Sequence, residues 1–492
     1  MNILSVDIGT SSVRVGLVDP TLQIKHITSR SVQLETDAAG KAEVDVEKVL
    51  RHTQACMQES LNWAESHVLP VEALSFSSAS ASLVCLDAQF NPIRPALTYA
   101  DLRASQESKW IIKTYGQQAF AHTGAPVHAS YWLPKFLWLR HQGLENFERL
   151  RFCTLKALLI YRLTGQFVMD TCNAGAVGLL NVEIMDWDEL SLGIAGINRQ
   201  QLPEIHPTTK ILEVQQDQKS LFSTLKRPPK VVLGAMDGIL ASLGVGAYQP
   251  GQVTTSLGSS GACRIAAASP LIDQNELRIW SYPLTQGLWV RGGAMNNGGL
   301  VTQWLAENFS SSREASDPAY REMLTSASKI SPGANGLVFL PYLFGERAPI
   351  YNERARGVFF GLHNGHRQAH FVRAGLEGIL YALYSIYEIL HSSQSEVGEI
   401  RATGGYVQSE LMLQIQADIF GQPILVPSEH EGSVIGAAAL AMKALGSIAD
   451  FDELEEFFKI KSQYIPDVKT RKGYQEQFAR FKALYEYLKP LF

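Results

Sequence analysis

The chain has 492 residues, and a single hydrophobic core stops growing at roughly 250–300 residues, so two domains are expected. Apolar residues make up 46% of the chain and charged residues 18%, a globular composition that excludes a disordered or coiled-coil protein. The net charge of −5 gives no general electrostatic footprint for nucleic acid or for an anionic membrane.

The N-terminal segment predicts a strand and not a signal peptide, because it lacks a basic region and Asp7 interrupts its apolar stretch. The longest apolar run, residues 231–247, is short for a membrane span and carries Asp237 near its middle. We therefore expect no transmembrane segment. The five cysteines form no CxxC pair, which favours a reduced cytoplasm as the location.

Two β-rich runs, residues 3–8 and 13–19, surround the small polar turn at residues 9–12 and predict a β-hairpin. A helix is expected over residues 44–66, and further strands follow it. This mixture of strands and helices argues for an α/β fold.

The first turn has the residues of a phosphate-binding loop. Successive backbone N–H groups in a Gly-Thr-Ser-Ser turn can wrap phosphate oxygens, and the hydroxyls add donors. Asp7, at the end of the preceding strand, can hold Mg²⁺, which usually keeps several of its waters. Taken alone, the motif is also typical of a polar hairpin turn that begins with Asp.

Asp237 is the only charged residue of the run 231–247. Because burying an unpaired carboxylate is expensive, Asp237 either caps the helix that starts near Gly238 or faces a functional cleft. Both can hold at once, since a strand-end residue at a helix N-terminus points into the cleft of an α/β sheet. A carboxylate positioned there can accept a hydroxyl proton.

A second hairpin is expected over residues 252–267, with a Gly-Ser-Ser-Gly turn at 258–261 and an Arg in its second strand, as in the first hairpin. A layout repeated so far apart suggests two related halves, with a boundary near residues 249–251. Two such turns facing each other would clamp a polyphosphate from both sides.

Later segments predict helices over residues 371–391, 409–420 and 432–445, and surface loops over 310–320 and 465–473. Paired glycines, Gly404 and Gly405, precede the second of these helices and let a flat ligand approach the backbone. The alternative for that pair is a simple strand-to-helix turn. A stripe of aromatic residues in the last helix is expected to pack on the chain's own core.

These segments resemble, in the same order and from end to end, the FGGY carbohydrate kinases. Residues 7–12 resemble the first phosphate loop of that family, 234–238 its catalytic-base segment, 256–261 its second phosphate loop, and 403–409 its adenosine motif. The resemblance implies two related α/β domains of the actin-like, ribonuclease H-like ATPase fold, residues 1–247 and 248–492, with the active site in the cleft between them.

The resemblance also implies the site residues and partners. It gives Asp237 as the catalytic base; Ser80, Ala81, Asp101, Arg103 and Asp237 as substrate-binding residues; Gly9, Thr10, Ser11, Ser12, Arg14, Gly258, Ser259, Ser260, Asn297, Gly404, Gly405 and Ser409 as ATP-binding residues; and Asp7 and Asp237 as metal ligands. The expected partners are ATP, Mg²⁺ and a small sugar or sugar acid, without nucleic acid or membrane. Dimers are common in the family, so a homodimer is an expected assembly.

Within the family the resemblance is strongest to gluconokinases, through residues 123–128, 295–299 and 345–349. It implies ATP-dependent phosphorylation of a primary hydroxyl, with gluconate as the leading substrate and a xylulokinase or other pentulose or hexulose kinase as the alternative. Ser80-Ala81 stands where the family often has Met-His, which leaves a sugar-binding regulator open. The alternative from another class is an actin- or Hsp70-like ATPase.

Overall fold

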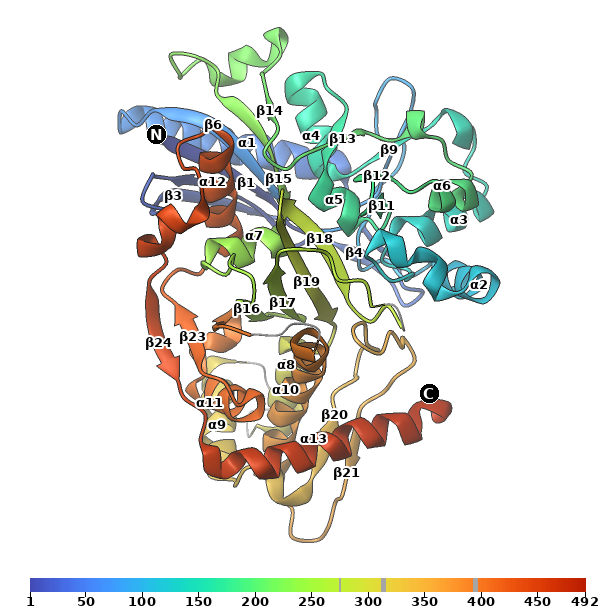
Figure 1. The fold of residues 1–492 in the computed structure, drawn as a ribbon, viewed down its shortest axis with the longest axis vertical. Helices are drawn as coiled ribbons and strands as arrows, with labels where there is room; N and C mark the ends of the chain where they lie inside the picture. Colours follow the sequence, from blue (N-terminus) through green and yellow to red (C-terminus); the bar gives the residue numbers. More distant parts are fainter. Residues whose placement is uncertain (274–275, 311–315, 393–396) are drawn as a thin grey trace. The chain divides into compact units, whose positions relative to one another are not determined.

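A computed structural model describes residues 1–273, 276–310, 316–392 and 397–492 (Figure 1). Its contacts divide the chain into two compact units. Unit 1 contains Met1–Tyr248, Ala267–Val290 and Glu431–Phe458, and unit 2 contains Gln249–Ala266, Arg291–His430 and Lys459–Phe492. This division differs from the two ranges expected from the sequence, because the segments 267–290 and 431–458 return to unit 1.

Unit 1 is built on a six-stranded sheet of order β14-β15-β6-β1-β2-β3. Its strands are β1 (Asn2–Ile8), β2 (Ser12–Val18), β3 (Ile24–Ser31), β6 (Val71–Ser78), β14 (Ile211–Leu212) and β15 (Lys230–Met236). The pairing of β1 with β2 is antiparallel, which confirms the predicted hairpin. The pairings β1–β6 and β6–β15 are parallel, so the carboxyl ends of these three strands lie at one edge of the sheet.

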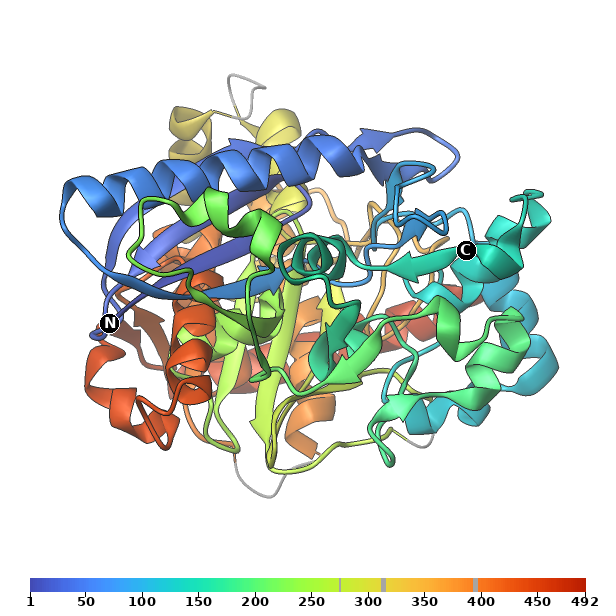
Figure 2. The same ribbon diagram turned by 90° about the horizontal axis from the view of Figure 1, so that it is seen from above.

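Alternate residues of β1 pack on opposite faces of this sheet. Leu4 and Val6 belong to the core that includes Val49 of α1 (Val46–Ser66), which runs along β2 and β3 (Figure 2). Ile3 belongs to a second core with Val434 of α12 (Gly432–Ala444). Helix α12 therefore covers the other face, the face toward which Asp7 is directed by the same alternation.

Glycines explain why α12 packs against unit 1 although it lies late in the chain. It contacts α7 (Asp237–Gly244). A Cβ on Gly244 would lie 1.9 Å from the Gly432 carbonyl oxygen, and a Cβ on Gly436 would lie 1.9 Å from the Leu240 oxygen. Only glycines allow the two helix backbones to approach this closely.

Unit 2 repeats the strand plan of unit 1. Its strands lie in the order β19-β17-β16-β22-β23-β24: β16 (Val253–Leu257), β17 (Gly261–Ala267), β19 (Leu288–Met295, which enters unit 2 at Arg291), β22 (Ile400–Thr403), β23 (Ile424–Pro427) and β24 (Ile460–Tyr464). The hairpin β16–β17 is antiparallel, β16 is parallel to β22, and β22 is parallel to β23. This shared plan confirms two related halves.

The helices of unit 2 are α8 (Gly299–Phe309), α9 (Asp317–Ser328), α10 (Gln368–Ser392), α11 (Glu410–Phe420) and α13 (Val468–Leu488). The helices α10 and α11 match the predicted ranges 371–391 and 409–420 to within three residues, whereas α8 and α9 were not predicted. The strands β20 (Val338–Leu340) and β21 (Val358–Phe360) form an antiparallel pair. The predicted loops 310–320 and 465–473 were too long, because α9 and α13 start within them. Residues 311–315 lie outside the described part of the chain.

The aromatic stripe of α13 is buried. Tyr474, Phe478, Phe481 and Tyr485 are each at most 5% exposed. Phe481 and Phe478 pack beside Tyr381 of α10, with ring centroids 5.6 and 6.0 Å away. The prediction that this stripe packs on the chain's own core is confirmed.

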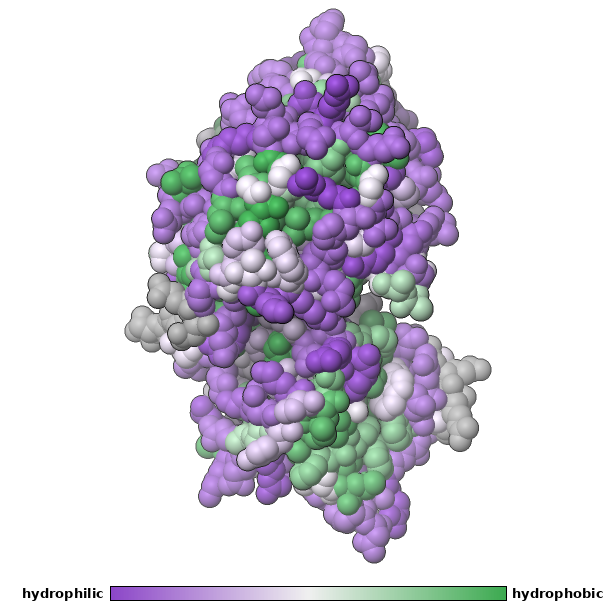
Figure 3. Space-filling view, turned by 90° about the vertical axis from the view of Figure 1, so that its right-hand side faces the viewer, coloured by the Kyte–Doolittle hydropathy of each residue, from purple (hydrophilic) through white to green (hydrophobic). Residues whose placement is uncertain are grey.

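The face viewed in Figure 3 is mostly hydrophilic, with hydrophobic residues in scattered groups. Within the described residues, no helix has both the length and the hydropathy that crossing a bilayer requires.

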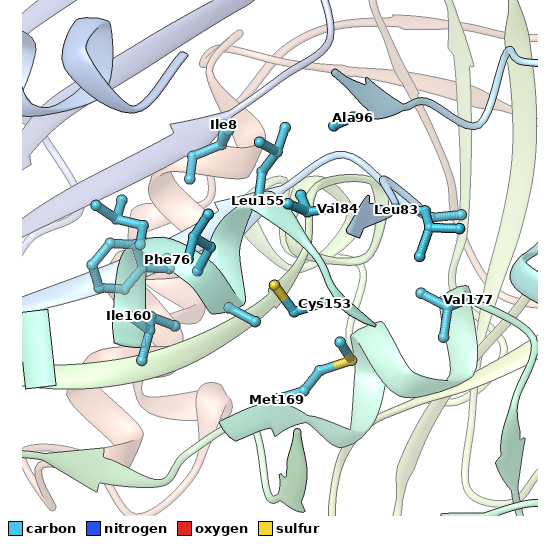
Figure 4. Packing of buried hydrophobic residues seen from close by; sticks show 14 of the residues in the cluster. Ile8, Phe76, Leu83, Val84, Ala96, Cys153, Leu155, Ile160, Met169 and Val177 are labelled. Atoms are coloured by element: carbon cyan, nitrogen blue, oxygen red, sulfur yellow. The ribbon is translucent and has the colours of Figure 1, made fainter. Parts of the chain in front are cut away.

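The remaining elements of unit 1 are short helices and strands. They are β4 (Glu35–Thr36), β5 (Ala42–Val44), β7 (Val84–Leu86), β8 (Ala96–Leu97), α2 (Ser105–Tyr115), α3 (Trp132–His141), β9 (Arg151–Cys153), α4 (Leu155–Thr164), β10 (Val168–Asp170), α5 (Thr171–Ala176), β11 (Leu180–Asn181), β12 (Asp186–Trp187), α6 (Glu189–Ala195), β13 (Glu204–His206) and β18 (Trp280–Thr285), which is hydrogen-bonded to β19. Phe76 of the sheet packs with Val84, Cys153 and Ile160 (Figure 4). Helix α5 contacts β15, the strand that ends at Met236.

Candidate active site

Asp237 directly follows β15 at the edge where the parallel strands end. In the register of these strands, Ile8 pairs with Ser78, and Ser78 pairs with Met236. The N-cap of α7 is Met236, so Asp237 is the first helical residue and not the cap. Its carboxylate accepts a hydrogen bond of 2.6 Å from the N–H of Gly238, and its side chain is half-buried. The side chain is therefore oriented by the helix start and remains partly accessible.

The turn between β1 and β2 lies beside this edge. The Gly9 N–H donates to the Ser12 carbonyl at 3.0 Å, and a Cβ on Gly9 would lie 2.8 Å from the same oxygen. Thr10 is half-buried and Ser11 is exposed. Gly9 thus permits the tight turn, and a ligand can reach the hydroxyl residues Thr10 and Ser11 of that turn.

Asp7 is 1% exposed, and both of its carboxylate oxygens accept hydrogen bonds. Its Oδ1 accepts from the Ser77 hydroxyl at 2.6 Å. Its Oδ2 accepts from Arg14 Nη2 at 2.8 Å and from the Ser433 hydroxyl at 3.1 Å. Sequence analysis missed Ser77 and Ser433, which come from β6 and from the start of α12.

Arg14 joins Asp7 to a further carboxylate that sequence analysis missed. Its Nη1 donates to Glu431 Oε2 at 2.7 Å. Burial lowers the pKa of Arg14, but the carboxylates of Asp7, Glu431 and Asp237 outweigh burial and raise that pKa overall. Asp237 therefore lies within electrostatic reach of the same guanidinium group.

Asp101 and Arg103 form a buried ionic cluster with Glu43. Arg103 donates to both oxygens of Asp101, with Nε at 3.1 Å from each, and it also donates to Glu43. Its guanidinium carbon lies 4.4 Å from the centroid of the Trp138 ring. Asp101 Oδ2 accepts a further bond from the Ala42 N–H at 2.9 Å. Asp101 thus orients Arg103. Glu43 and Trp138 also contact the Arg103 guanidinium, and the local sequence did not reveal these two contacts.

Ser80 and Ala81 lie in the loop between β6 and β7. Ser80 is half-buried, and Ala81 is buried with a positive φ of 52°. Nearby, Ser78 accepts a hydrogen bond of 3.2 Å from the Asn173 side chain of α5. The structure therefore places Ser80 and Ala81 beyond the same strand end as Asp7 and Asp237.

In unit 2, the turn at residues 258–260 packs on the start of α8. The Gly299 N–H donates to the Gly258 oxygen at 2.6 Å, and the Leu300 N–H donates to the Ser259 oxygen at 3.2 Å. A Cβ on Gly298 would lie 2.7 Å from the Ser260 oxygen. Gly258 and Ser259 are exposed and Ser260 is half-buried. The start of α8 thus holds the backbone of the turn, and the side of the turn away from α8 remains accessible.

Asn297, directly before this glycine pair, is fully buried. Its amide nitrogen donates to the Gly345 oxygen at 2.6 Å and to Glu346 Oε2 at 3.0 Å. Its amide oxygen accepts from the Phe344 N–H at 3.2 Å. Asn297 therefore holds the 344–346 loop to the end of β19, a structural role the sequence did not reveal.

Gly404 lies where β22 ends, with a φ of 93°. A Cβ there would lie 2.5 Å from the Leu257 oxygen, whereas a Cβ on Gly405 would meet nothing within 4 Å. Ser409 caps α11 by accepting from the Met412 N–H at 3.3 Å. The two glycines therefore have different roles: Gly404 permits the backbone turn, and Gly405 leaves open space above it.

The metal-binding prediction can be compared with the donors present. Among the residues that the structure describes, no group of three or more His, Cys, Asp or Glu side chains could enclose a metal ion. Mg²⁺ in kinase sites is usually held by one or two carboxylates together with water and substrate phosphates. The half-buried Asp237 carboxylate fits that pattern, whereas Asp7 is 1% exposed and both of its oxygens already accept hydrogen bonds, so Asp7 fits only as a ligand that acts through water.

Comparison with known proteins assigns the family. Residues 2–244 match the N-terminal domain of the FGGY family of carbohydrate kinases, and residues 253–445 match its C-terminal domain. The chain belongs to the FGGY family of carbohydrate kinases, and its fold is the two-domain α/β fold of these sugar kinases, within the actin-like ATPase group. This family assignment argues against the alternative of an actin- or Hsp70-like chaperone or filament ATPase.

The similar proteins are named for two different substrates, gluconate and xylulose. The gluconokinase of Bacillus subtilis (strain 168) is 33% identical over 482 residues, which cover 96% of this chain and 93% of that protein. The crystal structure of gluconate kinase from Lactobacillus acidophilus has a TM-score of 0.93 and 30% identity, covering 99% and 98% of the two chains. A ligand-bound xylulose kinase structure from the same organism gives the same TM-score, identity and coverage.

Proposed function

We propose that this carbohydrate kinase transfers a phosphoryl group from ATP to the terminal hydroxyl of gluconate and forms 6-phosphogluconate. One observation carries the proposal. The Asp237 carboxylate starts α7 at the same sheet edge as Asp7 and the turn at residues 9–12. A general base and a phosphate-binding turn at one edge are the two groups that phosphoryl transfer to an alcohol requires.

In the proposed reaction, Asp237 accepts the proton of the terminal hydroxyl while that oxygen attacks the γ-phosphorus and ADP leaves. The bond formed is O–P to the sugar, and the bond broken is the β,γ-bridging P–O bond. Backbone N–H groups of residues 9–12 would stabilise negative charge on the transferred group. Asp7 and Asp237 would hold Mg²⁺, which supplies positive charge to the phosphate oxygens when it is bound.

The proposed ATP contacts come from both units. In unit 1 they are Gly9, Thr10, Ser11, Ser12 and Arg14, and in unit 2 they are Gly258, Ser259, Ser260, Asn297, Gly404, Gly405 and Ser409. Arg14 would meet a phosphate with the N–H groups of its guanidinium that do not donate to Asp7 or Glu431. Gly405, with open space where a side chain would be, suits the approach of a flat base. Asn297 would act through the loop that it holds.

The proposed sugar contacts are Arg103, Asp101, Ser80, Ala81 and Asp237. The hydrogen bonds that Arg103 makes among the described residues come from its backbone N–H, Nε and Nη2, which leaves Nη1 for a substrate carboxylate. A guanidinium held between two carboxylates and an aromatic ring is preorganised for such a ligand. This geometry and the gluconokinase relative favour gluconate, whereas the xylulose kinase structure supports xylulose as the second candidate.

The substrate is tested by sugar-dependent ADP release with gluconate, xylulose, ribulose, glycerol and fuculose. We expect the highest kcat/KM with gluconate and a product phosphorylated on its terminal carbon, as identified by phosphorus NMR. Faster turnover of xylulose would replace gluconate by the second candidate. Tight sugar binding without ADP release would instead indicate a sugar-binding regulator.

Arg103→Lys separates the two candidates further. Lysine keeps the charge facing Asp101 and Glu43 but loses the planar fork. We expect the KM for gluconate to rise roughly 10-fold, the equivalent of about 1.4 kcal/mol, and the KM for xylulose, which lacks a carboxylate, to change much less. Equal changes for both sugars would contradict carboxylate recognition by Arg103.

A further inference from the structure

The residues at the start of α12 contact the first phosphate turn although they lie more than 400 positions later in the chain. Glu431 accepts from Arg14 at 2.7 Å across 417 positions, and Ser433 donates to Asp7 at 3.1 Å across 426 positions. All four residues belong to unit 1. Neither the phosphate-loop motif nor the family-like segments of the sequence pointed to Glu431 or Ser433.

The two contacts of Arg14 use different atoms of its guanidinium group. Arg14 uses Nη2 for Asp7 and Nη1 for Glu431. Because the guanidinium group is planar, two bonds from neighbouring nitrogens fix both its position and its plane. A single bond to Asp7 would leave the group free to rotate. An arginine side chain has considerable rotamer entropy, so the second carboxylate restricts freedom that ligand binding would otherwise have to remove.

The start of α12 is itself fixed in place. A Cβ on Gly432 would lie 2.9 Å from the Ala241 oxygen of α7, so these two backbones are in close contact. Helix α7 begins with Asp237, the proposed base. The residue whose carboxylate orients Arg14 thus directly precedes a helix that packs on the helix presenting Asp237.

Exposure supports a functional and not merely a stabilising role for this ion pair. The side chains of Arg14 and Glu431 are each 34% exposed, and ion pairs at such positions contribute little to folding stability. The guanidinium nevertheless lies beside the turn at residues 9–12 and within reach of three carboxylates. Its accessible position suits contact with an anionic ligand.

We propose that Glu431 is a positioning residue, which holds the Arg14 guanidinium in the orientation that binds a nucleotide phosphate. Ser433 is a second positioning residue, which holds the Asp7 carboxylate in place through its hydrogen bond. The inference rests on the proposed function in taking the ligand to be a nucleoside di- or triphosphate. It does not depend on the identity of the sugar.

Calorimetric binding of ADP in the presence of Mg²⁺ tests Glu431 without any sugar. We expect Glu431→Gln to weaken ADP binding roughly 10-fold, because the amide keeps the size of the side chain but loses its charge. Glu47→Gln is the matched control. It removes the carboxylate of another half-exposed Arg–Glu pair of unit 1, Arg162–Glu47, and should leave ADP affinity unchanged.

A double-mutant cycle shows whether Glu431 acts through Arg14. In an Arg14→Gln background, Glu431→Gln should change ADP affinity by less than roughly twofold. An equal 10-fold loss in both backgrounds would overturn the proposal, because Glu431 would then act independently of Arg14. Unchanged ADP affinity in the single variant would overturn it as well.

Ser433→Ala tests the second contact through a different readout. Removing the hydroxyl should raise the Mg²⁺ concentration needed for half-maximal ADP binding, while binding at saturating Mg²⁺ changes little. An unchanged Mg²⁺ requirement would remove Ser433 from the proposal. If Asp237→Asn abolishes turnover but neither Glu431→Gln nor Ser433→Ala affects ADP binding, the proposed function stands and this inference fails. If wild-type protein binds no ADP, the proposed function fails first.

Discussion

The hairpin β1–β2 of unit 1 and the hairpin β16–β17 of unit 2 share strand order and turn composition, but different forces hold their turns. In unit 1, Arg14 binds the carboxylates of Asp7 and Glu431. In unit 2, Arg264 donates to the hydroxyl of Ser256 at 3.2 Å. The first turn thus lies beside a network of formal charges, and the corresponding arginine of the second hairpin donates to a hydroxyl of the preceding strand.

Close backbone contacts hold the turn of unit 2. The turn at residues 258–260 bonds to the Gly299 N–H, and Gly298 fits against Ser260 with no space for a side chain. A duplicated turn can therefore keep its shape by ion pairing or by steric fit. Removing the charge of Asp7 should therefore disturb the first turn, and adding volume at Gly298 should disturb the second.

The largest effect is expected from Asp7→Asn. The amide keeps the size of the side chain but removes the charge that faces Arg14 and the proposed Mg²⁺. Turnover should fall at least ~10²-fold, a loss typical of a removed electrostatic group at a reacting phosphate. Steady-state kinetics measure it. The control is Asp19→Asn at the other end of β2, where the carboxylate pairs with Lys25 at 2.7 Å; a comparable loss there would show that removal of any charge from this hairpin suffices.

A smaller and different effect is expected from Gly298→Ala. The added methyl group would meet the Ser260 oxygen at 2.7 Å and the Gly258 oxygen at 3.0 Å, so the turn backbone must shift. We expect a destabilisation of about 1–3 kcal/mol, measured by thermal unfolding, together with a higher KM for ATP.

Gly473→Ala provides the control in the same unit. It lies inside α13, and a Cβ there would meet nothing within 4 Å, so alanine should stabilise the helix by up to about 1 kcal/mol. If Gly298→Ala were as stable as wild type and bound ATP equally well, steric fit would not be what holds the second turn.

How much of this could be read from the sequence depends on the range of the contacts. Both hairpins were predictable, because a strand, a glycine-hydroxyl turn and a second strand are adjacent in the chain. The strand end before Asp237 was predictable for the same reason. Its assignment as a possible helix cap was wrong, because the helix begins one residue earlier than the sequence suggested, with Met236 as the cap.

Glu431, Ser433 and Ser77 could not be found in this way. Each matters only because tertiary structure brings it to Asp7 or Arg14, and a serine in a strand or a glutamate before a helix carries no local signal. The same applies to Glu43 and Trp138 around Arg103. The extent of unit 1 was also hidden, since it depends on tertiary contacts of α12 with α7 and with the strands β1, β2, β6 and β15, which return residues 431–458 to that unit.

A pH-dependent effect on stability is expected from a buried amine close to the Asp101 cluster. Lys135 of α3 donates to the carbonyl oxygens of Thr98 at 2.6 Å and Ser130 at 2.8 Å. Burial lowers the pKa of Lys135 to about 7, against a weaker opposing effect of Asp101. Between pH 7 and about 10.4 the unfolded chain therefore binds a proton at this residue that the folded chain does not.

Since stability rises with pH wherever the unfolded state binds more protons, the stability of wild type relative to Lys135→Met should rise across this window by up to about 1.4 kcal/mol per pH unit. Denaturant unfolding of both proteins at pH 7 and pH 9 measures the difference. Equal slopes for the two proteins would show that Lys135 stays charged in the folded chain.

The role of Asp237 is tested most directly by the turnover of Asp237→Asn with saturating Mg-ATP and the best sugar of the substrate screen. We predict that kcat falls at least ~10²-fold, as expected for loss of a general base, while ADP binding and the thermal midpoint stay close to wild type. Near-normal turnover in this variant would contradict the assignment of Asp237 as the group that accepts the sugar's proton.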